Sequence, residues 1–469
     1  MMSRKQAWFH AFTLASFLLS GLCGAATEMK LPVPERETLP NGLQLVWFLN
    51  DSLPVIDMAL LVKSGSRDDP WGKSGTAELV ADSLDRGNDG LTSQELARKI
   101  EVLGASRYSS CEEDTFSVGV HGLAPDAPAL LDVLGKLVLK PEFPEAEIKR
   151  EHARLLDRWN HLADYGESLA GLAYRRLLTS GTTYGRGSFL SIKEFDNVSR
   201  GDVLAYYKTH FTPENSILMV VGRVKKDEFK KQIEAVFGAW QGEAPKKEYR
   251  KFVEKRLLDT KGKIVVVGRA NLTQAQVRIG FKSPSIHAPE HYDLTVGNAL
   301  LGEYFNSRLN SLIRDKLALT YGISSSFSFN QDFASFSIGS ATKNESVGPL
   351  VQKTLEVLKN FKSGPISDEE VTTAKEYLVG GFPLSVSTLG AVASRWLAGY
   401  VFDLGPTYLN EFVPKISAVT PAQVLAAAAK DFDLDHLTIV VAGEPKEIQK
   451  SLSAAGFKSI KQVSVKDLE

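Results

Sequence analysis

Residues 198–222 read VSRGDVLAYYKTHFTPENSILMVVG, and residues 419–443 repeat that pattern without gaps as VTPAQVLAAAAKDFDLDHLTIVVAG. Each stretch predicts a capped helix, a turn and a buried apolar strand, and each is followed by another predicted helix. An internal duplication accounts for the identical pairs, which are Val198/Val419, Val203/Val424, Leu204/Leu425, Ala205/Ala426, Phe211/Phe432, Val220/Val441 and Gly222/Gly443.

A charged stretch with few apolar residues separates the two copies and predicts an exposed linker over residues 246–261. We therefore expect a first domain over residues 31–245 and a second over residues 262–469. NGLQLVWFLN and VIDMALLVKSG predict two paired strands, and YGISSSFSFN and FASFSIGSA predict a hairpin. Predicted strands that follow one another in the sequence, without a helix between them, favour an α+β fold. We expect a mainly antiparallel sheet with packed helices in each domain.

The composition is that of a globular protein, with 43% hydrophobic and 24% charged residues and a net charge of -1. A nucleic-acid partner is not expected, because the chain has no basic surplus. Residues 1–26 resemble a signal peptide, with Arg4 and Lys5 before an apolar run, so we expect a periplasmic or secreted protein without a membrane span. A lipid anchor on Cys23 stays open. Cys111 is then the single remaining cysteine and is expected to be inert.

Three longer stretches carry a resemblance to a known family. They are residues 40–87, with Asn41-Gly42-Leu43, Gly65-Ser66-Arg67 and Gly75-x-Ala77; residues 103–118, with Asp114-Thr115; and residues 300–323, with Ser307-Arg308-Leu309, Arg314 and Tyr321. In this order they resemble the inverzincin (pitrilysin/insulinase) metallopeptidases, in particular the small bacterial and mitochondrial-processing-peptidase-like type. The resemblance implies a two-domain LuxS/MPP-like metallohydrolase fold.

The same resemblance places the zinc site directly after Gly75-x-Ala77. The two histidine positions hold Glu78 and Asp82, and the position of the glutamate base holds Ala81, whose methyl group cannot accept a proton from water. The window for the third ligand, LLDRWNHLA (155–163), contains no glutamate. We therefore expect no zinc site here. A hard cation held by Glu78 and Asp82, with Asp157 or His161, remains an alternative.

A second metal-like pattern lies in SIHAPEHYDL, where His287, Glu290 and His291 have the spacing H-x-x-E-H. Pro289 stands between the histidines and is tolerated only in the first turn of a helix. We therefore expect His287 to precede the helix, where it cannot share a face with His291. The simpler interpretation is a helix start with Glu290 near its positive end.

By resemblance, Arg314 and Tyr321 match an arginine and a tyrosine that reach the substrate beside the metal. A guanidinium or phenol placed there stabilises the negative charge that develops on a peptide carbonyl under attack. The alternatives are an arginine paired with Asp315 and a core tyrosine at a strand start. Arg308 is expected to support the structure.

These observations lead to three hypotheses. The first is an exported non-metal subunit, without a cofactor of its own, that pairs with a zinc-bearing homologue and supplies Arg314 and Tyr321 to cleave unfolded peptides. Self-association is the alternative assembly. The second is a binding or scaffold protein without catalytic function. The third is an autonomous zinc peptidase that uses the HAPEH motif.

Overall fold

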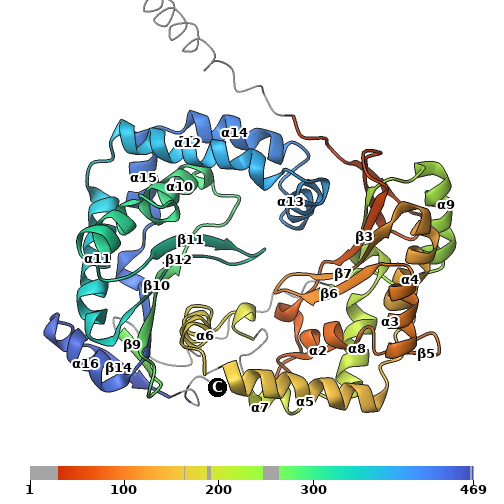
Figure 1. Cartoon of the computed structure of the whole chain (residues 1–469), viewed down its shortest axis with the longest axis horizontal. Helices are drawn as coiled ribbons and strands as arrows, with labels where there is room; N and C mark the ends of the chain where they lie inside the picture. The colour runs from red at the N-terminus through yellow and green to blue at the C-terminus, as the bar shows by residue number, and fades with distance from the viewer. Residues whose placement is uncertain (1–29, 163, 187–191, 247–263, 465–466, 468–469) are drawn as a thin grey trace, which may run out of the picture.

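The computed structural model describes residues 30–162, 164–186, 192–246, 264–464 and 467. The expected signal peptide (1–26) lies outside the described residues, as does the expected linker (246–261) apart from Lys246. Described residues form two sheets that face one another from opposite halves of the molecule, each with helices packed against it (Figure 1). The α+β prediction with two similar halves is confirmed.

The N-terminal half is built on a six-stranded sheet in the order β1-β2-β8-β3-β7-β6. Its strands are β1 (Glu35–Thr38), β2 (Gln44–Leu49), β3 (Val55–Val62), β6 (Ser106–Cys111), β7 (Phe116–Leu123) and β8 (Ser216–Gly222), with a small ribbon of β4 (Gly87–Asn88) and β5 (Leu91–Thr92). Its helices are α2 (Thr76–Ser83), α3 (Ser93–Val102), α4 (Ala127–Leu139), α5 (Glu145–Leu162), α6 (Gly166–Leu178), α7 (Ile192–Phe195), α8 (Arg200–His210) and α9 (Lys226–Phe237).

The predicted pairing of the first two long strands is wrong. Strand β8 lies between β2 and β3, parallel to β2 and antiparallel to β3. All seven residues of β8 are buried. Such a strand is apolar on both faces and gains most at the centre of a sheet, where both of its edges are also paired.

The C-terminal half has the order β14-β9-β13-β10-β12-β11, and its last five strands correspond in sequence order to β2, β8, β3, β7 and β6. The remaining edge strands differ, because β14 is parallel to β9 whereas β1 is antiparallel to β2. Its strands are β9 (Ile264–Gly268), β10 (Gln274–Lys282), β11 (Ile323–Phe329), β12 (Ala334–Lys343), β13 (Thr438–Gly443) and β14 (Ile460–Val463). Its α-helices are α10 (His291–Asn298), α11 (Val347–Ser363), α12 (Asp368–Ser385), α13 (Leu389–Val401), α14 (Tyr408–Ala418), α15 (Pro421–Asp431) and α16 (Pro445–Ala454). Strand β13 is parallel to β9 and antiparallel to β10, as β8 is to β2 and β3. The duplication therefore extends to strand pairing.

The repeated stretches form the predicted elements. Ser199 caps α8 and Thr420 caps α15, each through a capping box with the residue three positions later. This arrangement satisfies amide groups that the first turn of a helix leaves unpaired. The predicted hairpin is also confirmed, with β11 antiparallel to β12.

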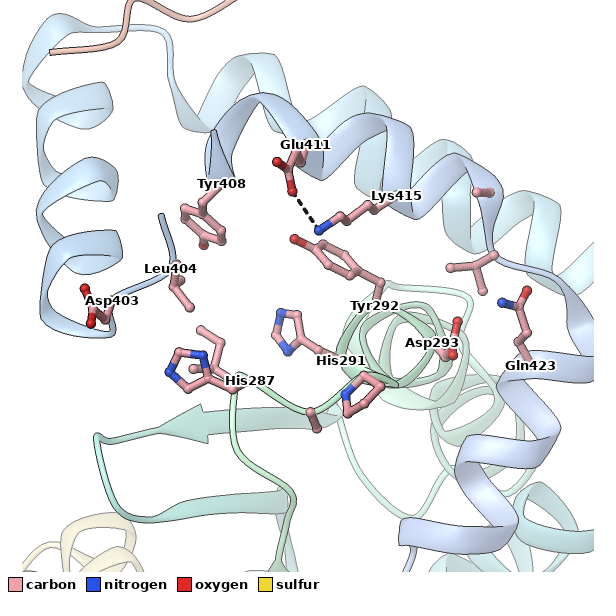
Figure 2. A pocket seen from close by; sticks show the side chains of 15 residues that line it. His287, His291, Tyr292, Asp293, Asp403, Leu404, Tyr408, Glu411, Lys415 and Gln423 are labelled. Atoms are coloured by element: carbon pink, nitrogen blue, oxygen red, sulfur yellow. Dashed lines mark ion pairs between the residues drawn. The ribbon is translucent and has the colours of Figure 1, made fainter. Parts of the chain in front are cut away.

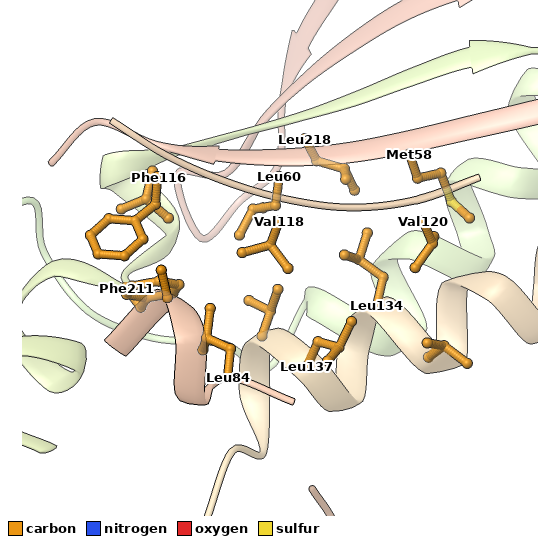
Figure 3. Close-up of a cluster of buried hydrophobic side chains, with 14 of the residues drawn as sticks. Met58, Leu60, Leu84, Phe116, Val118, Val120, Leu134, Leu137, Phe211 and Leu218 are labelled. Carbon is orange, nitrogen blue, oxygen red and sulfur yellow. The ribbon is translucent and has the colours of Figure 1, made fainter. Parts of the chain in front are cut away.

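Each half has its own hydrophobic core between its sheet and its helices. In the N-terminal half, Leu60 of β3, Val118 of β7 and Leu218 of β8 point towards Leu134 of α4 (Figure 3). All four side chains are buried. Alternate residues of each strand face this core, which follows from the two-residue period of a strand.

The halves also exchange one helix each. Helix α6 packs on the C-terminal sheet, where its buried Leu169 and Ala173 share a cluster with Val265 and Val440. Helix α13 packs on the N-terminal sheet, and its indole Trp396 Nε1 donates to the Pro32 carbonyl oxygen at 3.1 Å. The two halves therefore share buried apolar surface on both sheets.

A cluster of polar side chains, the Arg67 clasp, ties the tip of the β11–β12 hairpin to the N-terminal half. Arg67 Nη1 lies 2.7 Å from Asp114 Oδ1 and 2.9 Å from Asp332 Oδ2. The Tyr184 hydroxyl donates to Asp114 at 2.8 Å, and Arg67 Nη2 donates to Gln331 Oε1 at 2.6 Å. Arg67 and Asp114 are each 6% exposed, so this contact is largely dry.

Among the described helices, none taken singly has the length and apolar character needed to cross a membrane. Two sharply bent helix pairs, residues 368–385 with 389–401 and residues 408–418 with 421–436, pass that test on length and composition.

Candidate functional site

Helix α2 carries the three positions at which the resemblance places a zinc motif. Its N-terminus is held by Asp69, whose carboxylate accepts hydrogen bonds from the Gly75 and Ala77 amides at 2.7 and 2.8 Å. Gly75 has a φ of 89°, a left-handed conformation that glycine adopts without strain. This turn fixes where Glu78 and Asp82 point.

Two arginines from α5 occupy the space in front of those carboxylates. Arg158 lies 3.3 Å from Glu78 Oε1 and 3.2 Å from Asp82 Oδ2, so that one guanidinium bridges both. Arg154 lies 2.7 Å from Asp82 Oδ2 and 2.6 Å from Glu151 Oε2. The positive charge at this place is therefore supplied by the protein itself.

This arrangement removes both parts of metal-assisted hydrolysis from the site. Ala81 offers no base to activate water, and guanidinium groups cannot act as Lewis acids with open coordination positions. Asp157 and His161 interact with each other, with His161 Nδ1 3.5 Å from Asp157 Oδ1, and both side chains are largely exposed. Among the described residues, no three His, Cys, Asp or Glu side chains come close enough to share a metal ion.

A pocket of about 430 Å³ lies beside this site, between β6 and α6. Glu78, Cys111, Glu112, Glu113 and Arg175 line it. Burial raises the pKa of the Cys111 thiol, and the charges of Asp69 and Glu78 raise it further. The thiol is therefore held in its unreactive protonated form, as expected for an inert cysteine.

Arg314 lies in the C-terminal half, in a π-helical segment (Asn310–Lys316). The Asp315 carboxylate accepts from its Nε at 2.7 Å and from Nη2 at 3.1 Å, and these bonds raise the pKa of Arg314. The guanidinium also stacks on the Phe305 ring, 3.5 Å from its centroid. The alternative pairing with Asp315 is thus present, and 14% of the Arg314 side chain remains exposed.

Tyr321 precedes β11 and is 94% exposed, so the alternative of a core tyrosine is wrong. The residues on either side of it are nevertheless hydrogen-bonded. Neighbouring Thr320 donates to the Ala341 carbonyl oxygen at 2.6 Å and accepts from the Gly322 amide at 3.1 Å. Tyr321 therefore presents an open phenol on a braced turn, and β11, which follows it, lies in the half of the molecule opposite α2 (Figure 1).

Arg308 supports the structure, as predicted. It donates to Glu370 through Nε at 2.6 Å and Nη2 at 2.8 Å, and to the Pro365 carbonyl oxygen at 2.9 Å. Hydrogen bonds from Arg308 lower the pKa of Glu370 to about 2, although burial opposes them. The contact anchors the segment before Arg314 to α12.

This contact should make stability depend on pH. The folded pKa of Glu370 is depressed below the value of about 4.3 for an unfolded glutamate, so the stabilisation is complete above that value. It is lost as the pH falls towards 2. Urea unfolding at a series of pH values measures the free energy of unfolding. In Arg308→Met, the decrease in that free energy at acidic pH that comes from the Arg308–Glu370 contact should be absent. Identical acid profiles for the wild type and the variant would contradict the assignment.

Within the described residues, no third His, Cys, Asp or Glu joins the two histidines of the HAPEH motif as a metal ligand. Glu290 pairs with Lys430, with 2.6 Å between Oε1 and Nζ, and it occupies the N-cap position of α10 without a side-chain capping hydrogen bond. His287 precedes α10, as expected, so the two histidines share no helix face, although the turn lets both line one pocket (Figure 2). With Glu290 in an ion pair, the third hypothesis lacks its base.

Sequence reasoning missed the two arginines that face the former zinc positions. Arg154 and Arg158 are four residues apart on α5, a spacing that places side chains on one face of a helix. That spacing predicts two arginines on one face of α5, but it does not predict that they contact the carboxylates of α2, which is far away in sequence.

Comparisons with known proteins bear on this fold and site. Residues 46–178 match the insulinase family (peptidase family M16), and residues 197–378 match the family described as peptidase M16 inactive domain. The zinc protease YmxG of Bacillus subtilis is 24% identical over 87% of this chain and 98% of its own length. A probable mitochondrial-processing peptidase subunit beta of Arabidopsis thaliana is 24% identical, over 85% of this chain and 77% of that protein.

Solved structures show the same fold. A peptidase M16 inactive domain from Pseudomonas fluorescens superposes with a TM-score of 0.78 at 23% identity, covering 88% of this chain and 98% of that one. A protease from Helicobacter pylori gives a TM-score of 0.78 at 21% identity, covering 88% and 100%. Because the two matched family ranges together take in most of the chain, in the order of its two halves, the protein belongs to the insulinase family of peptidases, family M16.

Proposed function

We propose that this chain is the exported, non-metal subunit of a zinc peptidase, active together with a zinc-bearing homologue. The zinc and the water-activating base belong to the partner. Arg314 and Tyr321 of this chain then bind the peptide and stabilise the charge that develops on its carbonyl oxygen. The chain itself is a family member whose zinc positions carry carboxylates paired with arginines.

One observation carries the proposal: the expected metal-ligand positions Glu78 and Asp82 form ion pairs with the chain's own arginine, whereas Tyr321 stands open between hydrogen-bonded neighbours. An exposed tyrosine contributes little to the core, so its position on this turn calls for a role outside it. A donor that stabilises a developing oxyanion works best when it is already in position, because no free energy is then lost in reorienting it during the reaction.

Flexible peptides are the substrate class that suits the proposal. Strand β6 ends one sheet and β11 ends the other, and each has one edge without a partner strand among the described residues. A peptide can add to such an edge through backbone hydrogen bonds, largely independently of its sequence. Export to the periplasm or beyond forms part of this proposal.

The experiment compares the isolated chain with a complex formed by co-expression with a zinc-bearing homologue. The isolated chain is expected to contain less than stoichiometric zinc by elemental analysis and to leave unfolded peptides intact. The complex should cleave them and lose that activity to a chelator. Chelator-sensitive cleavage by the isolated chain would overturn the proposal.

The scaffold alternative is favoured by the contacts of Arg314. Its guanidinium is bound by Asp315 and stacked on Phe305, so it must exchange these contacts to reach a substrate. A complex that retains full activity when both Arg314 and Tyr321 are replaced by alanine would support a scaffold and reject the catalytic contribution.

A further inference from the structure

The pocket around the HAPEH turn is open to solvent, with His287 and Asp403 exposed and His291, Tyr292 and Tyr408 half-buried, and the proposed function does not use it. It has a volume of about 490 Å³ and lies between the turn after β10, the start of α10 and helix α14 (Figure 2). Its polar and aromatic lining consists of His287, His291, Tyr292, Asp293, Asp403, Tyr408, Glu411, Lys415 and Gln423.

Several polar groups of this lining lack partners within the part of the chain that the structure describes. Neither imidazole, of His287 or of His291, forms a side-chain hydrogen bond there, and the hydroxyls of Tyr292 and Tyr408 form none. Figure 2 shows both imidazoles and both phenol rings around the same space. Polar groups that face a cavity and have no protein partner form their hydrogen bonds with water or with a ligand.

The imidazole of His291 can act as an acceptor. Burial, together with the nearby His287 and Lys415, lowers the pKa of His291 to about 4, so the ring is neutral at neutral pH. One nitrogen of a neutral imidazole carries no proton and accepts a hydrogen bond. The pocket thus offers an acceptor inside and aromatic faces around it.

Charge in the pocket is predominantly negative. Lys415 is neutralised by Glu411, 2.7 Å away, and its ammonium already lies over the Tyr292 ring at 5.1 Å from the centroid. Asp403 has no ion pair among the described residues, and burial together with the charge of Glu290 raises the pKa of Asp293. Asp403 and Asp293 lie at opposite ends of the pocket (Figure 2). A cation at the Asp403 end would pair with that carboxylate and could use the aromatic faces, as the chain's own lysine does.

We propose that this pocket binds a basic side chain, and arginine better than lysine. A guanidinium is planar, stacks on tyrosine and histidine rings, and carries five N–H donors that suit imidazole, phenol and carboxylate acceptors such as those of this lining. His287 and Asp403 also line an adjoining pocket of about 420 Å³ that reaches Gln44 and Ile217 of the N-terminal half. A peptide backbone carrying the side chain has room there. This assignment does not depend on the proposed peptidase role.

The test uses Nα-acetyl-arginine amide as probe and the citrulline analogue, which has nearly the same shape but no charge, as its matched control. Binding to the full chain is followed by calorimetry and by the NMR signals of the histidine rings. The arginine probe should bind at least about tenfold more tightly than the citrulline probe and shift two histidine signals, which disappear in His287→Gln and His291→Gln. A tenfold difference corresponds to about 1.4 kcal/mol.

Asp403→Asn removes the charge and keeps the backbone, because asparagine tolerates the left-handed φ of 57° found here. This variant should reduce arginine binding to the citrulline level. Asp51→Asn, at a carboxylate 91% exposed in the other half, should leave binding unchanged. Equal binding of the two probes, or full arginine binding by Asp403→Asn, overturns the proposal. So does stoichiometric zinc bound with His287 and His291, which would assign the pocket to a metal.

Discussion

Changing Tyr321 to phenylalanine is expected to lower the kcat/KM of the complex with a zinc-bearing homologue about 10²- to 10³-fold, the usual effect of losing one oxyanion donor. The substitution removes only a hydroxyl from a ring that is 94% exposed, so folding and assembly should persist. Peptide cleavage gives the rate, and size-exclusion chromatography checks the complex. A loss confined to KM would indicate a binding role only.

Matched variants separate this effect from a general disturbance of the surface. Tyr165→Phe removes the hydroxyl of another tyrosine, 67% exposed, and should leave the rate unchanged. Asp315→Asn weakens the ion pair that holds Arg314 and should maintain or raise the rate, whereas Arg314→Ala should lower it. Equal rates for Tyr321→Phe and the wild type would remove the proposed catalytic contribution.

Replacing Arg67 by methionine is expected to produce the largest loss of stability. Asp114 is 6% exposed and would be left in a dry site without its cation. Breaking a buried pair in this way costs about 3–5 kcal/mol, because the remaining charge is uncompensated. Urea unfolding measures the loss. The hairpin tip at Gln331 and Asp332 should also gain faster amide exchange, because Arg67 contacts both side chains.

Arg175→Met provides the control for this prediction. Arg175 pairs with Glu113, but its side chain is 59% exposed, so the pair should contribute only about 0–1 kcal/mol. Replacing Asp114 by asparagine in the Arg67→Met background should recover part of the lost stability, because it removes the stranded charge. Equal losses for Arg67→Met and Arg175→Met would show that the clasp does not hold the two halves together.

Local patterns in the sequence predicted most elements but not their neighbours. The capped helices at Ser199 and Thr420 and the β11–β12 hairpin follow from signals within a few residues. The insertion of β8 between β2 and β3 joins segments that are far apart in sequence. The exchange of α6 and α13 likewise depends on tertiary packing, because each helix covers an apolar face of the sheet in the other half.

The candidate site shows the same division. Glu78, Ala81 and Asp82 lie at helical spacing on α2, as expected, and the prediction that they replace the ligands and base of a zinc motif rests on the sequence resemblance. That Tyr321 is exposed and Arg314 is held by Asp315 became evident only in three dimensions.

By itself, the sequence determined the duplication, the mixed helix-and-sheet fold and which residues stand at the positions of the expected zinc motif, since each follows from residue identity alone. Only the tertiary structure decided which charges meet: Arg158 against Glu78 and Asp82, Arg67 against Asp114 and Asp332, and two histidines in one pocket. Electrostatic energy varies with distance and burial, and both are settled when helices and sheets from separate parts of the chain pack together.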